Sequence, residues 1–203
     1  MAGKWPKIRS REITKVSPWM SILAREVEFA SGTELQVYHA VDQADYVSIV
    51  AVTPDGRFPL VRQYRPALED YTWELPCGTV DPGEDAAETC RRELLEETGF
   101  ATQAIRRVGN GSPCTGRLNN RIHAFYVATG EQVAEPEPGI TLRLVTAREL
   151  ARMIRAGEFV SQLHIGSLML AELYGLIELP RLAPRKRSSR KRTAPRKKSR
   201  SKA

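Results

Sequence analysis

Three glutamates lie close together in the sequence at spacings that place them on one side of a helix. Glu93, Glu96 and Glu97 are three and four positions apart, and an α-helix turns by about 100° per residue. Like charges at these spacings destabilise a helix unless something positive lies among them. Mg²⁺ and Mn²⁺ bind carboxylate and carbonyl oxygens and need no His or Cys. The pattern therefore favours a hard divalent cation, with a solvated acidic surface as the simpler alternative.

The neighbouring side of the same segment is suited to packing. Ala87, Cys90 and Leu94 form an apolar stripe beside the glutamates. Arg92 lies four residues before Glu96 and can orient it, but one guanidinium does not neutralise three carboxylates. The surrounding fold must therefore bury the apolar stripe and leave the acidic side open to a ligand.

The elements that would hold this helix predict an α+β fold. Apolar and alternating runs predict strands at residues 22–29, 34–41, 46–53, 58–64, 122–128 and 140–145. Asp55-Gly56 predicts a tight hairpin between the third and fourth of these strands. The other turn signal is 31–33, so the first half of the chain is expected to form a meander.

Three helices are expected from their capping signals. Asp85, with Glu88 three residues later, predicts a capping box at the start of the acidic helix, and Gly99 predicts its end. A second capping box, at residues 146–149, predicts a helix that Gly157 ends. Ser161 is expected to cap a last helix that runs to about residue 176.

The whole segment around the glutamates carries a more specific signal. It matches the pattern G-x5-E-x7-R-E-U-x-E-E-x-G-U, in which U is apolar, at every fixed position: Gly78, Glu84, Arg92, Glu93, Leu94, Glu96, Glu97, Gly99 and Phe100. Fixed residue types at background frequencies near 6% make a chance match rarer than about one in a million. That rarity sets the simple acidic surface aside, and the chain resembles the Nudix hydrolase superfamily.

The flanking sequence resembles the ADP-ribose pyrophosphatase branch of that superfamily. The resemblance rests on VRQYRPALEDYTWELPCGTVDPGE, on Ser112-Pro113 and on ELARMIRAGEF, and it covers residues 16–176. It implies a Nudix-type α/β/α sandwich with a mixed β-sheet and an N-terminal antiparallel β extension. It also implies hydrolysis of the diphosphate linkage of ADP-ribose or a related nucleoside diphosphate sugar, giving a nucleoside monophosphate and a sugar phosphate.

The same resemblance assigns roles to individual residues. Mg²⁺ or Mn²⁺ would be held by Glu93, Glu97 and the main-chain carbonyl of Cys77, with Glu96 as a further ligand or as a carboxylate that positions water. Arg92 would orient the glutamates, and Glu84 would brace the loop against the helix. Bound metal would neutralise charge on the diphosphate and activate water for in-line attack.

The general base departs from the family pattern. Many relatives carry a glutamate just before the strand at residues 122–128, where this chain has Asn120, and an amide is no useful base at neutral pH. The base is therefore expected from Glu135 or Glu137 in the following loop, or the metal-activated water needs none.

Substrate contacts are expected from the segment before the acidic helix. Arg62 and Arg65 could contact phosphate oxygens, and Trp73 or Tyr71 could stack on a base. Glu74 could accept from a nucleotide amine or a ribose hydroxyl. Surface arginines, core aromatics and a loop-stabilising glutamate are the alternatives. His39, His123 and His164 are expected to be structural, because no ligand spacing links them.

Composition and charge divide the chain into three parts. Residues 1–43 are expected to form the β extension, 44–180 the hydrolase domain, and 181–203 a disordered basic tail. The tail carries twelve Lys or Arg and no acid, whereas residues 1–180 carry nineteen bases against 24 acids. No secretory signal or membrane span is evident, and Cys77, Cys90 and Cys114 form no CxxC pair and are expected to be buried thiols. A cytoplasmic protein is expected.

Three further expectations concern partners and competing functions. The N-terminal extension predicts a homodimer, on the resemblance alone. The basic tail could bind nucleic acid through phosphates with little sequence preference, or could be a solubilising segment. A Nudix hydrolase of another substrate, such as GDP-mannose or a dinucleoside polyphosphate, remains the alternative enzyme.

Overall fold

The computed structural model describes residues 5–181 and residue 183. Three strands come first, β1 (Lys7–Ser17), β2 (Met20–Glu28) and β3 (Gln36–Gln43), and they form an antiparallel sheet. The elements that follow are β4 (Tyr46–Val52), β5 (Phe58–Arg65), β6 (Asp70–Glu74), β7 (Cys77–Thr79), α1 (Ala86–Thr98), β8 (Phe100–Gly111), β9 (Ile122–Gln132), β10 (Thr141–Val145), α2 (Ala147–Ala156) and α3 (Gln162–Leu173).

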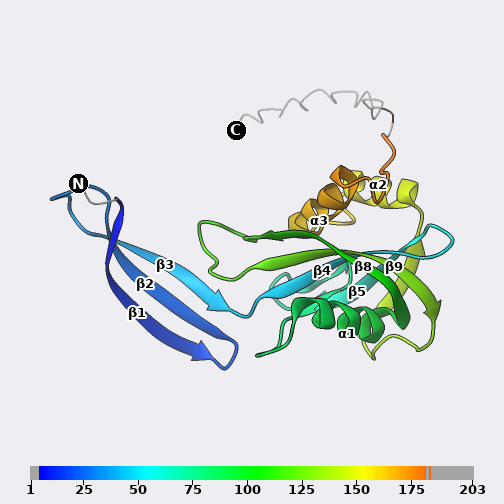
Figure 1. The fold of residues 1–203 in the computed structure, drawn as a ribbon, viewed down its shortest axis with the longest axis horizontal. Coiled ribbons are helices and arrows are strands. Elements are labelled where there is room, and N and C mark those ends of the chain that lie inside the picture. The colour runs from blue at the N-terminus through cyan, green and yellow to red at the C-terminus, as the bar shows by residue number, and fades with distance from the viewer. Residues whose placement is uncertain (1–4, 182, 184–203) are drawn as a thin grey trace, which may run out of the picture.

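The body contains two further sheets. One has the strand order β7-β4-β9-β8, in which β4 and β9 run parallel and the other neighbours run antiparallel. The other has the order β10-β5-β6 and is antiparallel throughout. The expected mixed sheet is therefore present, and helices cover it on both sides (Figure 1).

Strand β4 lies at the centre of this arrangement because both of its faces are apolar. Val47, Ile49 and Ala51 pack on one face with the apolar stripe of α1, whereas Val50 packs on the other face with Leu168 of α3. A strand buried on both faces shows a continuous apolar run and suits a parallel partner. The result is a sandwich with α1 on one side of the mixed sheet and α3 on the other.

The N-terminal sheet projects away from this body (Figure 1). Its strands pair in an antiparallel register, for example Ala24 with His39. Contacts with the body include an isolated bridge between Val41 and Leu118 and a hydrogen bond from the Asn119 amide to Asp42 at 2.9 Å. The extension predicted from sequence is thus a separate layer joined to the body at the end of β3.

Two strand predictions need correction. The turn at Asp55-Gly56 forms, with Gly56 N–H donating to Thr53 O at 2.8 Å, but β4 and β5 separate into different sheets instead of pairing as a hairpin. Because both faces of β4 are apolar, the strand is buried inside the mixed sheet, where it pairs with β9. Strands β1 and β8 were not expected, because neither stretch of sequence shows a clear alternation of apolar and polar residues.

Two local predictions are also wrong. Asp85 caps α1 by accepting from Ala87 N–H, but Glu88 pairs with Arg91 and forms no capping box. Cys114 is exposed in the loop between β8 and β9, whereas Cys90 is buried and Cys77 is partly buried. The capping box at Thr146 and Glu149 and the Ser161 cap of α3 are present as predicted.

Two expectations concern the chain ends and the membrane. No helix within the described residues has the length and apolar character needed to cross a bilayer. The basic segment 181–203 lies outside the described residues apart from Arg181 and Ala183, so its predicted disorder and nucleic-acid contact remain predictions.

Candidate active site

The acidic helix is held by caps and by its apolar stripe. Cys90 and Leu94 are completely buried against β4 and β9, and burial of a leucine side chain contributes about 1.5–3 kcal/mol. Gly99 ends the helix in the left-handed conformation with a φ of 73°, and its N–H donates to Leu95 O. The helix therefore has one fixed rotation about its axis, and the glutamates face the space beside β7.

Arg92 is the centre of an ion-pair network on this helix. Its Nη1 donates to Glu93 at 2.8 Å and to Glu96 at 3.0 Å. Its Nε and Nη2 donate to Glu84 at 3.1 and 3.0 Å, and Nη2 also contacts Thr79 O at 3.3 Å. The guanidinium thus joins the loop before α1 to two of the three clustered glutamates, and these bonds raise its own pKa while lowering that of Glu84 to about 2.

Glu97 turns inward, away from Arg92. It is only 5% exposed. Its Oε2 accepts from the Cys77 N–H at 2.8 Å, and its Oε1 accepts from the Gln63 side-chain amide at 3.0 Å. These two bonds attach the C-terminal end of α1 to β7 and β5.

Glu93 lies directly against the main chain of Gly78. A Cβ placed on Gly78 would meet the Glu93 carboxyl carbon at 1.8 Å, so only glycine leaves room for this carboxylate. Glu93 and Glu97 are consequently both brought to the Cys77–Gly78 peptide, one at the missing side chain and one at the Cys77 N–H. This lack of space explains why the first fixed position of the motif is a glycine.

Burial and mutual repulsion perturb the carboxylates. Burial raises the pKa of Glu97 to about 7, and the charge of Glu93 adds to the rise, while the bonds from Cys77 and Gln63 oppose it. Burial also raises the pKa of Glu93, against the opposing effect of Arg92, and Glu96 and Glu137 raise it further. Carboxylates held together at such a cost are typical of functional sites.

The donor set fits a hard divalent cation. Two carboxylates meet a main-chain segment at Gly78, and a third, Glu96, lies one turn away on the same helix, so carboxylate oxygens converge as such a cation requires. Cation binding would offset the repulsion and the burial that now raise both pKa values. On this observation Glu93, Glu97, Glu96 and the Cys77 carbonyl remain the candidate ligands.

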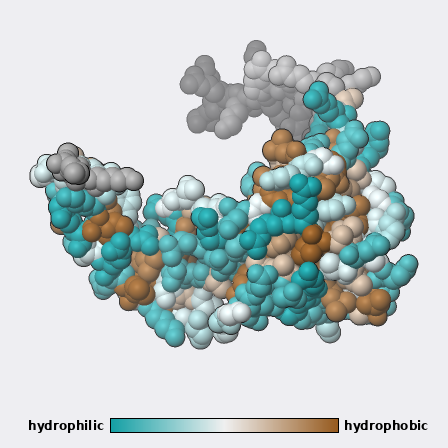
Figure 2. Space-filling model, in the orientation of Figure 1, coloured by the Kyte–Doolittle hydropathy of each residue, from teal (hydrophilic) through white to brown (hydrophobic). Residues whose placement is uncertain are grey.

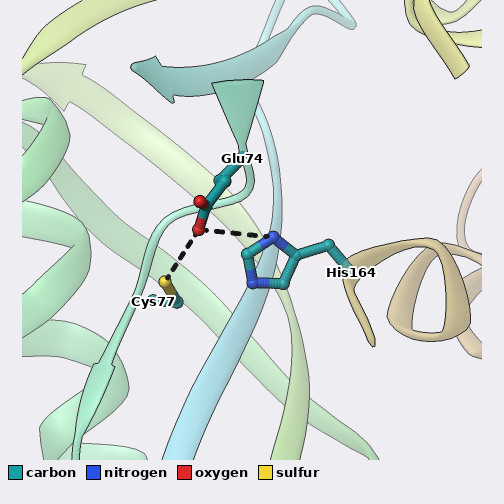
Figure 3. A group of neighbouring side chains, drawn as sticks. All are labelled: Glu74, Cys77 and His164. Carbon is teal, nitrogen blue, oxygen red and sulfur yellow. Dashed lines mark hydrogen bonds and ion pairs between the residues drawn. The ribbon is translucent and has the colours of Figure 1, made fainter. Parts of the chain in front are cut away.

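A second group of potential ligands lies nearby but suits a cation less well. Single ligand atoms of Glu74, Cys77 and His164 lie within 4.8 Å of one another (Figure 3). Arg65 already binds Glu74 through two bonds, at 2.9 and 2.6 Å, and contacts the Cys77 sulfur at 3.5 Å. His164 Nδ1 accepts from the Leu75 N–H at 3.3 Å. A guanidinium therefore occupies the position where a cation would bind.

Strand alternation separates the predicted substrate-binding residues. Arg65 bonds to Glu74 on the face of β5 and β6 where Gln63 meets Glu97. Arg62 instead lies over Tyr71 at 4.8 Å, and Arg143 lies over Trp73 at 5.8 Å, beside a separate cavity of about 660 Å³. Because neighbouring residues in a strand point to opposite faces, Arg65 and Glu74 lie with the glutamates while Arg62 and Trp73 do not.

The loop that carries the base in relatives has a structural role here. Asn120 is 3% exposed, and its amide donates to Ala44 O at 2.9 Å. The flanking residues are bonded there as well, Asn119 to Asp42 near the end of β3 and the Arg121 N–H to Asp45 just before β4. This loop is therefore fixed to the N-terminal extension.

Of the two candidate bases, Glu137 is the one that contacts the acidic helix. Its N–H donates to Glu96 O at 2.9 Å, and its charge contributes to the raised pKa of Glu93. Glu135 is exposed two residues earlier in the same loop.

Gln63 and Tyr46 were not named as site residues from the sequence, and His164 was expected to be structural only. Gln63 holds Glu97, and Tyr46 and His164 line a cavity beside Cys77 and Gly78. Gln63 could have been found from its position two residues before Arg65, on the same face of β5. No sequence signal brings Tyr46 and His164 together, since they come from β4 and α3.

Comparisons with known proteins identify the family of the chain. The NUDIX domain family model matches residues 42–161, more than half of the chain. A CMP-5'-(N-acetyl-N-hydroxy-3-aminopropyl)phosphonate hydrolase of Streptomyces rubellomurinus is 28% identical over 177 residues, which cover 85% of each protein. An ADP-ribose pyrophosphatase of Mycobacterium tuberculosis is 29% identical over 154 residues, covering 72% of this chain and 74% of that protein.

A solved structure with the same fold was also found. The crystal structure of an ADP compounds hydrolase matches with a TM-score of 0.71 at 22% sequence identity, covering 87% of this chain and 100% of that one. At this identity the match establishes the fold, and the family match and the relatives establish the class of protein. The chain belongs to the NUDIX domain family and is a hydrolase similar to ADP-ribose pyrophosphatases.

Proposed function

We propose that this hydrolase cleaves the diphosphate linkage of a nucleoside diphosphate sugar, with ADP-ribose as the first candidate and Mg²⁺ or Mn²⁺ as cofactor. The observation that carries the proposal is the convergence of Glu93 and Glu97 on the Cys77–Gly78 peptide. The two relatives described above, an ADP-ribose pyrophosphatase and a CMP-phosphonate hydrolase, are named for substrates in which a nucleotide is joined to a second group, and this supports the same substrate class here.

In this proposal, separate residues bind the cation and orient the glutamates. Glu93, Glu97 and the Cys77 carbonyl would hold the cation, with Glu96 as the third carboxylate. Arg92 keeps Glu93 and Glu96 oriented through its two short bonds, and Glu84 anchors Arg92 to the loop. A divalent cation supplies Lewis-acid polarisation of the diphosphate oxygens.

The base is assigned to Glu137. The position before β9, where many relatives carry the general-base glutamate, is occupied here by Asn120, which is buried and donates to Ala44 O. This position therefore offers no carboxylate. Glu137 is exposed and lies next to Glu96 at the open side of the cluster. An exposed carboxylate beside the ligands can accept the proton of an attacking water and return it to solvent.

A substrate panel tests the proposal. The purified protein with Mg²⁺ is incubated with ADP-ribose, GDP-mannose, a dinucleoside polyphosphate and a CMP conjugate, and products are separated by chromatography. ADP-ribose should give AMP and ribose 5-phosphate with the highest kcat/KM. The Glu97→Gln variant is the inactive control, and Glu88→Gln, which changes an exposed carboxylate on the same helix, is the matched active control.

The panel also decides between substrates. Preference for the CMP conjugate would move the assignment toward the activity named for the Streptomyces relative. Preference for GDP-mannose or a dinucleoside polyphosphate would keep the enzyme class and change the substrate. Absence of turnover for every diphosphate would overturn the proposal.

We propose a homodimer through the N-terminal sheet, with residues 1–43 as the extension and 44–180 as the hydrolase domain. Brown, apolar patches lie on the projecting sheet in Figure 2. Its exposed apolar side chains include Ile13, Val16 and Trp19, which are 66%, 56% and 80% exposed. Such side chains on a projecting sheet favour an interface. Sedimentation analysis of the wild type and of Trp19→Ser tests this, and a monomeric wild type at micromolar concentration would refute it.

The basic tail stays a separate prediction. If it binds polynucleotides, affinity for RNA or DNA should fall steeply with salt and disappear in a chain that ends at Pro180, with hydrolysis unchanged. Salt-independent binding, or binding that survives the truncation, would remove the tail from this role.

A further inference from the structure

A cavity of about 300 Å³ opens beside the proposed cation site, between β7 and the start of α3. Cys77, Gly78 and Thr79 form one wall of the cavity. This wall includes the Cys77–Gly78 peptide, which Glu93 and Glu97 also contact. Volumes from about 300 Å³ upward are typical of small-molecule sites. The cavity is therefore placed to receive one of the two groups that the diphosphate joins.

The charges around the cavity cancel one another. Arg65 and Glu74 both line it, but they bind each other through two short bonds. The Nε and Nη2 donors of Arg65 are already bonded to Glu74 and Cys77, so only Nη1 is left to donate, and the guanidinium within 3.5 Å of the Cys77 sulfur disfavours a cation. A neutral group suits this space better than an ion of either sign.

The remaining polar groups are neutral. His164 Nδ1 accepts from the Leu75 N–H, so the ring proton is on Nε2, and the dashed line in Figure 3 joins Glu74 to Nδ1 and not to Nε2. Within residues 5–181 no protein atom accepts from this nitrogen, and the Tyr46 hydroxyl likewise has no partner there. The Ser161 hydroxyl oxygen accepts from the main-chain N–H of His164, so the hydroxyl hydrogen of Ser161 is free to donate.

We infer that this cavity binds the sugar of the substrate, with the Tyr46 hydroxyl and the His164 ring as specificity-determining hydrogen-bond partners. A sugar hydroxyl both donates and accepts, as do the tyrosine and serine hydroxyls. The aliphatic Leu163 and the Tyr46 ring, which also line the cavity, can cover the apolar face of a sugar ring. The inference rests on the proposed function for the position of the diphosphate, which leaves the nucleoside outside this cavity.

Binding without turnover tests the inference separately from the proposed function. Calorimetry in Mg²⁺ gives the Kd of ribose 5-phosphate, AMP and inorganic phosphate for the wild type, Tyr46→Phe and Tyr174→Phe. Tyr174 is the matched control, because it is exposed at the end of α3. Loss of one hydrogen bond should raise the Kd of ribose 5-phosphate about two- to tenfold in Tyr46→Phe, with inorganic phosphate, AMP and the control unchanged.

His164→Asn provides a second measurement. Asparagine can still accept from the Leu75 N–H but lacks the Nε2 donor, so it too should weaken ribose 5-phosphate binding while keeping the wild-type unfolding midpoint. A change in the Kd of AMP alone would assign the cavity to the nucleoside, and an equal change for inorganic phosphate would make it a phosphate site. No change for any ligand in either variant would show that it binds no part of the substrate. All three results overturn the inference.

The two proposals fail in distinguishable ways. Ribose 5-phosphate binding that depends on Tyr46, in a protein that cleaves no diphosphate, would keep the sugar site and remove the proposed function. Hydrolysis of ADP-ribose at the wild-type kcat/KM by Tyr46→Phe and His164→Asn would keep the function and remove the sugar site.

Discussion

Replacing Glu97 by Gln should make the metal-free protein more stable at neutral pH while abolishing its activity. The Glu97 pKa rises from 4.5 to about 7 on folding, so the folded state retains a proton that the unfolded state has lost between these pH values. A raised pKa means that this contribution to stability is fully present below pH 4.5 and is lost as pH rises through 7. The difference corresponds to about 3 kcal/mol at pH 8.

Glutamine removes this cost with little loss of contacts. Its carbonyl can accept from the Cys77 N–H, and the Gln63 amide can turn over to accept from the new NH₂ group, so both present bonds are replaced. The expected gain in unfolding free energy is therefore about 2–3 kcal/mol at pH 8 and close to zero at pH 4.5.

Urea unfolding in EDTA at pH 4.5, 6, 7 and 8 measures this difference. Glu88→Gln is the control, and as an exposed change it should stay within about 0.5 kcal/mol of the wild type. Added Mn²⁺ should stabilise the wild type more than Glu97→Gln, because only the wild type offers the full ligand set. A variant that is less stable than the wild type at pH 8 in EDTA would show that Glu97 is held as a favourable carboxylate, and the argument from burial would be wrong.

Three further predictions follow from contacts in the site. Gly78→Ala places a Cβ 1.8 Å from the Glu93 carboxyl carbon, and displacement of that ligand should weaken Mn²⁺ binding, followed by electron paramagnetic resonance, about 10- to 100-fold; unchanged affinity would exclude Glu93 as a ligand. Arg92→Lys keeps the charge but cannot reproduce the bonds to Glu84, Glu93 and Glu96, so kcat should fall about 10- to 100-fold, and wild-type kinetics would deny Arg92 a positioning role. Glu137→Gln should lower kcat about 100- to 10,000-fold if Glu137 is the base; a larger loss in Glu135→Gln would transfer the role to that residue.

Local patterns in the sequence were enough for the family, the helices and the residues of the acidic cluster. The motif from Gly78 to Phe100, the α1 ends at Asp85 and Gly99 and the cap at Thr146 all depend on neighbours within a few residues. Helix hydrogen bonds and caps are short-range interactions, so the amino-acid order specifies them directly. The ligand and base assignments remain predictions that the proposed measurements address.

Contacts between distant segments were decided only when the chain folded. Gln63 meets Glu97 across 34 positions, and the Leu75 N–H meets His164 across 89. Which of the two arginines of β5, Arg62 or Arg65, faces the glutamates depends on the pairing of that strand, and the loss of the expected hairpin depends on the burial of both faces of β4. A strand's face and partner are set by the apolar surface that the rest of the protein offers, and no short stretch of sequence contains that information.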